Sequence, residues 1–288
     1  MTWVAWRQQR AQLMVAFALV ALVAAVMVFV RIDVSSMPGD QGQLSDRYNQ
    51  FLSYVPMVML VLPVLLGMFA GAPVFAREIE QGTHIFGLTQ SISRSRWWAT
   101  KLAVAGLPII IAMATLGIVN AWALGPLNFI MSGRMRTPLF ESQGLVLGAY
   151  TAVAFAIGAT AGLLVRNTLA AMAITLGGYT AMLVVVSNAA RPAYADPTYS
   201  TGLLPTDVWR VESGYLDGAG KPVSIAPEKC GMETIAECLA GQGVRSEFAW
   251  FHAGERFWSF QAIEAGLFAA LTAAVLALGA WAVHRRLR

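Results

Sequence analysis

Charged residues are scarce in this sequence. Only 12% of its 288 residues are Asp, Glu, Lys or Arg, whereas 57% are hydrophobic. A water-soluble domain carries about a quarter of its residues as charges, so the composition excludes an ordinary soluble domain. It predicts an integral membrane protein.

Cysteine and histidine are also rare. The three histidines (His84, His252 and His284) fall in separate segments, and two cysteines alone cannot make a four-ligand zinc site. We therefore expect no bound metal. Cys230 and Cys238 have seven residues between them, a spacing that closes a small disulfide loop in an oxidising compartment. Free thiols are the alternative.

Motifs for catalysis and nucleotide binding are missing. The sequence has no H-E-x-x-H and no G-x-S-x-G, and the nearest match to a Walker loop, Gly220-Lys221, is followed by Pro222 and lacks the first glycine. The basic residues, which give a net charge of +4, form no long run interleaved with aromatics, so nucleic acid is not an expected partner. We expect no catalytic residue and no cofactor bound by this chain.

Long apolar runs are what the sequence does contain. Six of them are long enough to cross a hydrocarbon core of about 30 Å as helices. They are residues 12–30, 51–75, 102–124, 144–165, 169–187 and 259–283. Pro56, Pro63 and Pro108 are expected to kink the second and third helices without ending them. The predicted fold class is an all-α integral membrane protein with six transmembrane helices.

Basic residues are denser on one face of the membrane. With the N-terminus inside, the inner segments hold ten of the twenty Lys and Arg residues in less than half the length of the outer segments, which is the positive-inside pattern. Both chain ends then lie in the cytoplasm. The first apolar run is too long for a signal peptide and lacks a small-residue cleavage site, so it is expected to stay as the first helix.

The long segment after the fifth helix is then placed outside. We divide the chain into 1–187 with five transmembrane helices, an extracellular cap at 188–258, and 259–288 with the sixth helix and a basic tail. Prolines, glycines and both cysteines indicate that the cap is compact. Aromatic residues near its end are expected to anchor it at the lipid headgroups. They are Trp250, Phe251, Phe257 and Trp258.

A polar stretch, residues 76–101, separates the second and third apolar runs and must lie in water at the inner face. Glu78 and Glu80 are expected to continue the preceding helix beyond the membrane. Gly82 permits a break, and Ser93 is placed to cap a new helix that begins at the next residue. The stretch is therefore expected to have a definite structure.

Part of this stretch has the pattern of a short amphipathic helix. Ile85, Leu88 and Ile92 are spaced three and four residues apart and would form one apolar face. Three interpretations remain open. The stretch is a charged hairpin between two spans, a lipid-binding element that uses Arg94, Arg96 and the two adjacent tryptophans, or a docking element for a soluble subunit.

Two motifs in this stretch favour docking. The run E-x-E-x-G-T is followed by T-Q-S-x-S-R-x-R-W and then a lysine. This pattern resembles the cytoplasmic loop of type 2 ABC exporter permeases, particularly small bacterial ones encoded separately from their ATPase. The motifs cover about 25 residues, and the order of spans and loops is similar over nearly the whole chain. The matching residues are Glu78, Glu80, Gly82, Thr83, Thr89, Ser93, Arg94, Arg96, Trp97 and Lys101.

The resemblance implies a transporter that is driven by a partner ATPase. Two permease subunits, identical or paralogous, would lie side by side in a bacterial plasma membrane, and a cytosolic ABC ATPase that binds ATP and Mg²⁺ would be held under each. The implied coupling helix lies between the second and third spans. The residues implied to couple it to the ATPase are Glu78, Glu80, Gly82, Thr83, Ile85, Leu88 and Arg94. Solvated charge at a helix end is the alternative for the two glutamates.

Two helix faces suit a substrate path. Each combines thioethers or aliphatic groups with hydroxyls at spacings of three and four residues, which suits an amphipathic ligand, and in the family these two helices line the central cavity. The residues are Met172, Thr175, Tyr179 and Met182 on the fifth helix, and Tyr54, Met57, Val61, Val64 and Met68 on the second. Helix-packing core is the alternative.

Two further features concern the apolar runs themselves. Glu264 is an ionisable residue a short way into the sixth run, so it is either functional or close enough to the outer end to reach water. Three G-x-x-x-G motifs, which begin at Gly67, Gly144 and Gly158, permit helices to approach closely. They do not tell which helices meet.

The predicted function is that of a permease subunit. It would export a hydrophobic or amphipathic small molecule or peptide, resembling a drug or antibiotic, with ATP hydrolysis in a separate subunit. A membrane-embedded enzyme finds no support in the motifs. A non-transporting scaffold or sensor with a ligand-binding cap is the remaining alternative.

Overall fold

The computed structural model of the protein describes residues 2–37, 41–83, 93–130, 133–202, 204–205, 207–226, 228, 230 and 234–286. Six of its helical segments are long and apolar enough to cross a membrane, which confirms the predicted class. They are Trp6–Ser36, Gln41–Glu80, Arg94–Leu127, Val146–Val165, Thr168–Ala193 and Gly254–Arg285.

The first three spans are longer than the apolar runs that predict them, because polar residues extend the helices at their ends. Helix α1 (Thr2–Ser36) packs along α5 (Arg94–Leu124), which ends in the 3₁₀ turn η2 (Gly125–Leu127). The second span joins three pieces, which are α2 (Gln41–Leu66), the π-helical turn η1 (Gly67–Gly71) and α3 (Pro73–Glu80). The prolines predicted to be tolerated lie inside α2 and α5.

The other three spans include the most buried helix of the bundle, α7 (Val146–Val165). Helix α8 (Thr168–Val185) continues through a π-helical turn, η3 (Val186–Ala190), and a 3₁₀ turn, η4 (Arg191–Ala193). The last span is α10 (Phe257–Arg286), preceded by the 3₁₀ turn η6 (Gly254–Arg256). A short helix, α6 (Leu139–Ser142), precedes α7. The α7 helix contacts α2, α3, α5, α8 and α10, so it is the centre of the bundle.

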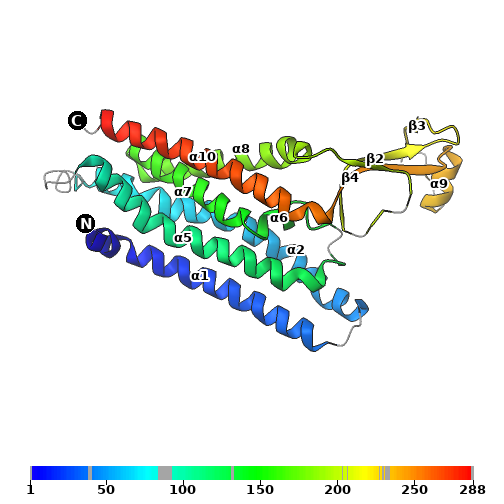
Figure 1. Cartoon of the computed structure of the whole chain (residues 1–288), viewed down its shortest axis with the longest axis horizontal. Coiled ribbons are helices and arrows are strands. Elements are labelled where there is room, and N and C mark those ends of the chain that lie inside the picture. Colours follow the sequence, from blue (N-terminus) through cyan, green and yellow to red (C-terminus); the bar gives the residue numbers. More distant parts are fainter. Residues whose placement is uncertain are drawn as a thin grey trace.

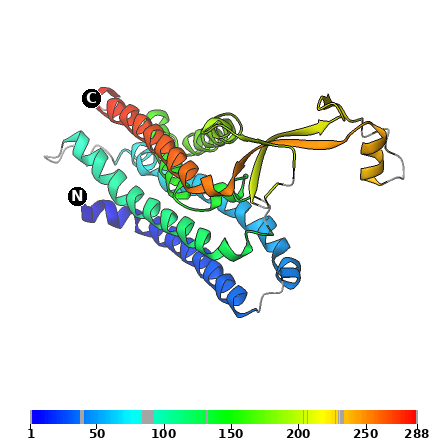
Figure 2. The ribbon, with the colours of Figure 1, turned by 45° about the vertical axis from the view of Figure 1, so that its right-hand side comes forward.

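Both ends of the chain lie at one end of the bundle, and the cap extends from the other (Figure 1). The start of α5 and the end of α3 lie at the end that holds the termini. Figure 2 shows the cap as an arm that continues from α8 and α10 well beyond the helices. The bundle therefore presents two different ends to the two sides of a membrane.

Glycine permits the close approach of α7 to the second span. A Cβ atom on Gly67 would lie 2.6 Å from the carbonyl oxygen of Ala154, and one on Gly71 would lie 2.8 Å from that of Phe155. On α7 itself, a Cβ on Gly158 would meet the backbone of Gly67 and Ala72. Two of the three glycine motifs therefore pack α7 against η1 and α3. The structure thus shows which helices these motifs bring together, which the sequence did not tell.

The cap contains a small antiparallel sheet, which the sequence analysis did not predict. Its strands lie in the order β1 (Thr198–Ser200), β4 (Ser246–Ala253), β2 (Val208–Leu216) and β3 (Pro222–Val223). The longest pairing joins β2 and β4, with a bulge between Arg210 and Glu212. The class remains mainly helical, and the sheet is an addition to it.

The aromatic residues near the end of the cap are only partly placed as expected. Trp250 and Trp258 are 38% and 53% exposed, but Phe251 and Phe257 are buried. The expectation that all four face the headgroups is wrong, because alternation along β4 turns Phe251 away from the exposed side of the strand. Phe257 opens α10 and packs edge-on against Phe140.

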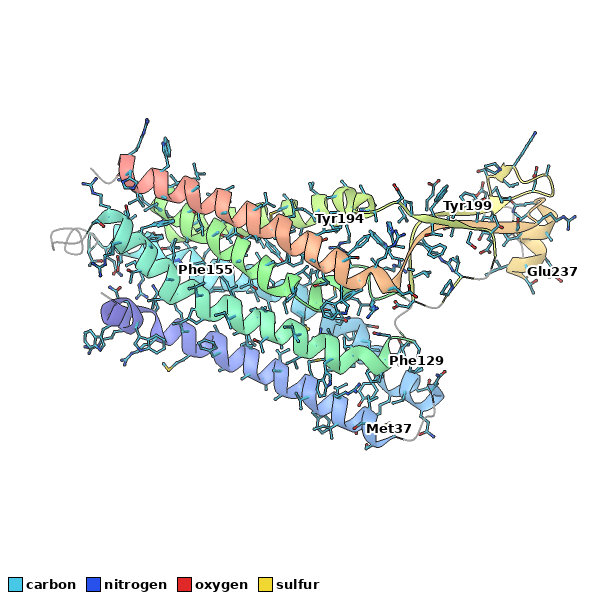
Figure 3. All side chains as sticks on the ribbon, viewed as in Figure 1. Met37, Phe129, Phe155, Tyr194, Tyr199 and Glu237 are labelled. Carbon is cyan, nitrogen blue, oxygen red and sulfur yellow. A yellow bond between two sulfur atoms is a disulfide. The ribbon has the colours of Figure 1, made fainter. Side chains whose placement is uncertain are left out.

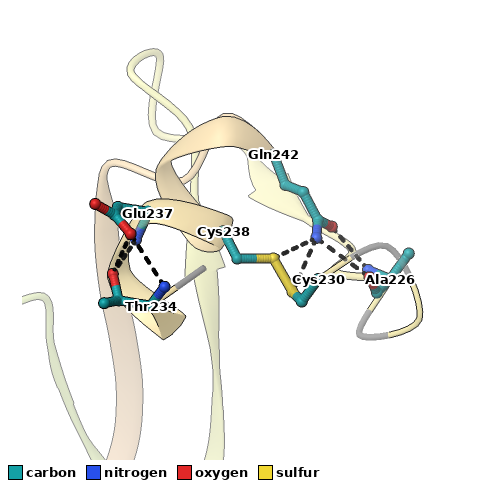
Figure 4. The surroundings of a disulfide bond; sticks show 6 residues. All are labelled: Ala226, Cys230, Thr234, Glu237, Cys238 and Gln242. Atoms are coloured by element: carbon teal, nitrogen blue, oxygen red, sulfur yellow. Dashed lines mark hydrogen bonds between the residues drawn. A yellow bond between two sulfur atoms is a disulfide. The ribbon is translucent and has the colours of Figure 1, made fainter. Parts of the chain in front are cut away.

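The far end of the cap is closed by a disulfide between Cys230 and Cys238, whose Cα atoms are 5.5 Å apart (Figure 4). Cys238 lies in α9 (Ile235–Gly241), which begins with a capping box between Thr234 and Glu237. Hydrogen bonds from the Thr234 side chain and backbone lower the pKa of Glu237. The amide of Gln242 accepts from Ala226 N at 2.9 Å and donates to its carbonyl oxygen at 3.2 Å.

Replacing Gly67 by Ala tests the close packing. We expect G67A to lower the free energy of unfolding by about 1–3 kcal/mol, because its Cβ collides with backbone that cannot move freely. The matched control is G177A on α8, whose Cβ meets no atom of the described residues within 4 Å. This variant should be neutral or slightly stabilising. Unfolding in detergent, followed by tryptophan fluorescence, measures both. Equal stability of the two variants would contradict the packing argument.

Candidate functional site

The end of α3 is tied to two other spans through its two glutamates. Glu78 forms an ion pair with Lys101 of α5, whose side chain is buried. The Lys101 ammonium also lies 5.1 Å from the centre of the Trp97 ring, which packs against Phe75. A buried lysine without such a partner would cost several kcal/mol. This pair therefore fixes α3 against α5.

Glu80 points to a different helix. Its carboxylate accepts hydrogen bonds from the backbone N–H and the hydroxyl of Thr168, both at 2.8 Å. Thr168 is the first residue of α8, and Asn167 caps the same helix by accepting from Ala170 N at 2.8 Å. A carboxylate at a helix N-terminus is also favoured by the helix dipole. Glu80 therefore joins α3 to the start of α8.

The predicted coupling residues are only partly described. Gly82 has φ +70°, a left-handed conformation that glycine adopts easily, and the Thr83 hydroxyl donates to the Glu78 carbonyl at 3.4 Å. Arg94 is the first residue of α5, and Ser93 caps that helix as expected. Ile85 and Leu88 lie outside the described residues. Pairing of Glu78 and Glu80 with an ATPase remains a prediction, and both carboxylates have partners within the chain.

The residues predicted for a substrate path differ in how deeply they are buried. On α8, Thr175 and Tyr179 are buried, while Met172 and Met182 pack against hydrophobic clusters of the bundle. This burial agrees with the alternative that this face of α8 belongs to the helix-packing core. The face on the second span divides into two parts. Its exposed part is Tyr54, Met57 and Val61, and the part packed against the core is Val64 and Met68.

Two cavities lie elsewhere. One, of about 320 Å³, lies between the first turns of α1 and the end of the second span, and Arg77 and Gln81 help to line it. The other, of about 460 Å³, lies in the cap beside β2 and β4 and is lined in part by Arg210, Arg245 and Phe248. Among the described residues, no three His, Cys, Asp or Glu side chains come together in a way that could hold a metal ion.

A buried charge network at the cap end of the bundle was missed by the sequence analysis. Its centre is Arg191 of η4, which is only 1% exposed. The guanidinium donates to both carboxylate oxygens of Glu264, at 2.9 and 2.7 Å. It also donates to Glu141 at 2.7 Å and to the Tyr150 hydroxyl at 3.1 Å. The network thus connects α6, α7, the end of α8, and α10.

Glu264 therefore does not reach water, since it is fully buried and ion-paired with Arg191. Tyr150 donates a further hydrogen bond to it, and the guanidinium lies 4.2 Å from the centre of the Phe140 ring. One signal was available in the sequence. Arg191 comes shortly after the fifth apolar run, and Glu264 lies a short way into the sixth, so opposite charges fall near the same end of two spans.

A second contact joins the cap to the bundle beside this network. His252 of β4 is buried, and its Nε2 atom lies 3.1 Å from the carbonyl oxygen of Pro192. Its ring packs against Phe260 of α10. Burial lowers the pKa of His252, and the positive charge of Arg256 lowers it further, against the effect of the Pro192 hydrogen bond. Tyr194, labelled in Figure 3 where the helices meet the cap, packs against the same phenylalanine.

The six spans define a multi-pass membrane protein with the junction of α3, α5 and α8 at one end of its bundle and the cap at the other. A family model described as ABC-2 membrane transporter related matches residues 11–191. Because the match covers more than half of the chain, the protein belongs to that family and is a transport membrane component. No curated protein and no solved structure matches it.

Replacement of Arg191 by Leu tests the charge network. The variant would leave two buried carboxylates without their counter-charge, so we expect it to be about 3–5 kcal/mol less stable. R210L, at an exposed position on β2, should change stability by less than about 0.5 kcal/mol. The triple variant R191L/E141Q/E264Q should recover most of the loss, since no net charge stays buried. Chemical unfolding in detergent is the measurement, and no rescue would contradict the electrostatic cause.

His252 should make the joint between cap and bundle sensitive to acid. Because the pKa of His252 is lowered in the folded protein, the fold favours the neutral imidazole. The contribution of His252 to the stability of the joint is therefore complete above the ordinary histidine pKa of about 6.5. That contribution is lost as pH falls from there toward the folded pKa. Hydrogen exchange of β4 should therefore be faster at pH of about 5.5 than at about 7.5, after correction for intrinsic rates. The acid-dependent part should vanish in H252Q; its persistence would exclude His252 as the cause.

Proposed function

We propose that this chain is the permease subunit of an ABC exporter, driven by ATP hydrolysis in a separate cytosolic subunit. Family membership supports a permease. The density of Lys and Arg supports placing both termini, and the segment between α3 and α5, in the cytoplasm. The membrane would be a bacterial plasma membrane, with the cap on its outer side.

The junction at the end of α3 is the observation that carries this proposal. An ATPase that moved the segment between α3 and α5 would act on α3 directly. The Glu78–Lys101 ion pair would transmit this movement to α5, and the hydrogen bonds from Thr168 to Glu80 would transmit it to α8. Because α3 also packs against α7, the movement would reach the centre of the bundle.

The exposed face of α2 supports a hydrophobic or amphipathic cargo. Tyr54 and Met57 are 64% and 56% exposed on α2, so a second copy placed against this face would enclose them between the subunits. Such a cavity would be lined by aliphatic, thioether and aromatic groups with few charges. It would suit a hydrophobic or amphipathic small molecule or peptide.

One observation favours a second candidate function. The cap cavity of about 460 Å³ is large enough for a small ligand and contains two arginines. A non-transporting scaffold or sensor would use this cavity without an ATPase. Co-purification separates the two functions, because the permease should retain a soluble ATPase and the sensor should not.

Glu80 provides the test of coupling. With the co-purified ATPase reconstituted in vesicles, we expect E80A to lower cargo-stimulated ATP hydrolysis about tenfold, because two hydrogen bonds to a charged group are lost. E237A is the matched control. Glu237 lies in the cap and accepts from the backbone N–H and the hydroxyl of Thr234, as Glu80 does from those of Thr168. E237A should remove a similar contact and leave hydrolysis unchanged. Full stimulation in E80A, or the absence of any ATPase partner, would overturn the proposal.

A further inference from the structure

The cavity between α1 and the end of the second span has the size and the polar groups of a small binding site. Its volume of about 320 Å³ is at the lower end of the range of ligand pockets. Gln8, Gln9 and Gln12 of α1 line one side, and Arg77 and Gln81 line the other. The site is thus built mainly from amides and one guanidinium.

Arg77 supplies a positive charge to the lining of this cavity. Glu78 also lines it, but this carboxylate is ion-paired with Lys101. The Arg77 side chain has no hydrogen-bond or ion-pair partner in the described part of the chain and is exposed beside the cavity. A guanidinium with neighbouring amide N–H groups is suited to a phosphate.

A second polar group indicates that the ligand also carries a donor. The Oε1 atom of Gln12 is buried and has no hydrogen-bond partner among the residues that the structure describes. A buried acceptor left without a partner is costly, so most such atoms in proteins are satisfied. If the Gln12 amide turns toward the cavity, a ligand with an N–H or O–H group close to its phosphate would supply the missing donor.

The cavity lies next to a surface of α1 that is suited to contact lipid. Gln8 and Gln12 are followed on the same face of α1, at spacings of three and four residues, by exposed apolar side chains. These are Val15, Leu19, Leu22 and Val26. Trp3 and Trp6, in the first turns of the helix, are 65% and 46% exposed, as expected of side chains at a headgroup layer. The cavity therefore opens at the start of a lipid-facing stripe.

We propose that this cavity binds the headgroup of a phospholipid that carries a free amine or hydroxyl. The phosphate lies beside Arg77, the amine or hydroxyl donates to Gln12 Oε1, and the acyl chains follow the apolar stripe of α1. Because the cavity adjoins Gln81 and Thr83, the bound lipid contacts the end of α3 just before the segment implied in coupling.

Lipids with identical acyl chains and different headgroups provide the test. The purified full-length chain is titrated in detergent with phosphatidylethanolamine, phosphatidylglycerol and phosphatidylcholine, and bound lipid is counted by native mass spectrometry. We expect the first two to bind about tenfold more tightly than phosphatidylcholine, whose quaternary amine has no hydrogen to donate to Gln12. Equal binding of all three lipids would overturn the proposal.

Two variants assign the contacts. Q12M should abolish the preference over phosphatidylcholine, whereas Q50M, at an exposed position of α2, should keep it. R77Q should weaken all three lipids, and R210Q in the cap should not. Unaltered binding in R77Q, or displacement of the lipid by millimolar inorganic phosphate alone, would also refute a lipid site. The measurement uses the permease without an ATPase, so its outcome is independent of the exporter proposal.

Discussion

A charge buried in a membrane protein must find its counter-charge within the protein, because the hydrocarbon around it offers neither water nor ions. This chain meets that constraint at both ends of its helix bundle. At the end that holds the termini, Lys101 is paired with Glu78, and at the cap end Arg191 is paired with Glu264 and Glu141. Each pair joins residues that are distant in sequence. The charges that the fold had to neutralise therefore also determine which helices stay together.

Between these two ends, α7 provides a rigid connection. Its small residues bring its backbone against η1 and α3, and Gly67 and Gly158 leave no space for a side chain at these contacts. The neighbouring helices α8 and α10 have largely exposed outer faces, in contrast to α7. A displacement of α3 is consequently transferred through backbone contacts, which yield less than flexible side chains do. This stiffness is what a transporter needs if its energy source lies outside the membrane.

The sequence predicts most of the bundle, because long apolar runs and a capping serine at Ser93 are local signals. It does not predict the Arg191 network, because the pairing of Arg191 with Glu141 and Glu264 depends on how α6, α8 and α10 pack. It also does not predict the sheet in the cap. The aromatic residues of β4 fit a headgroup anchor as well as a strand, and only the pairing with β2 distinguishes the two. In the same way, spacing alone placed Thr175 and Tyr179 on one face but could not tell core from cavity.

The π-helical turn at Gly67–Gly71 has a mechanical consequence for the segment that follows it. Such a turn holds one residue more than an α-helical turn. Its return to α geometry would rotate everything downstream by about 100°, the angle of one residue in an α-helix. Glu80 would then swing away from Thr168, and the start of α8 would lose its acidic partner. The two hydrogen bonds from Thr168 to Glu80 therefore oppose rotation of α3 about its axis and hold it in its present orientation.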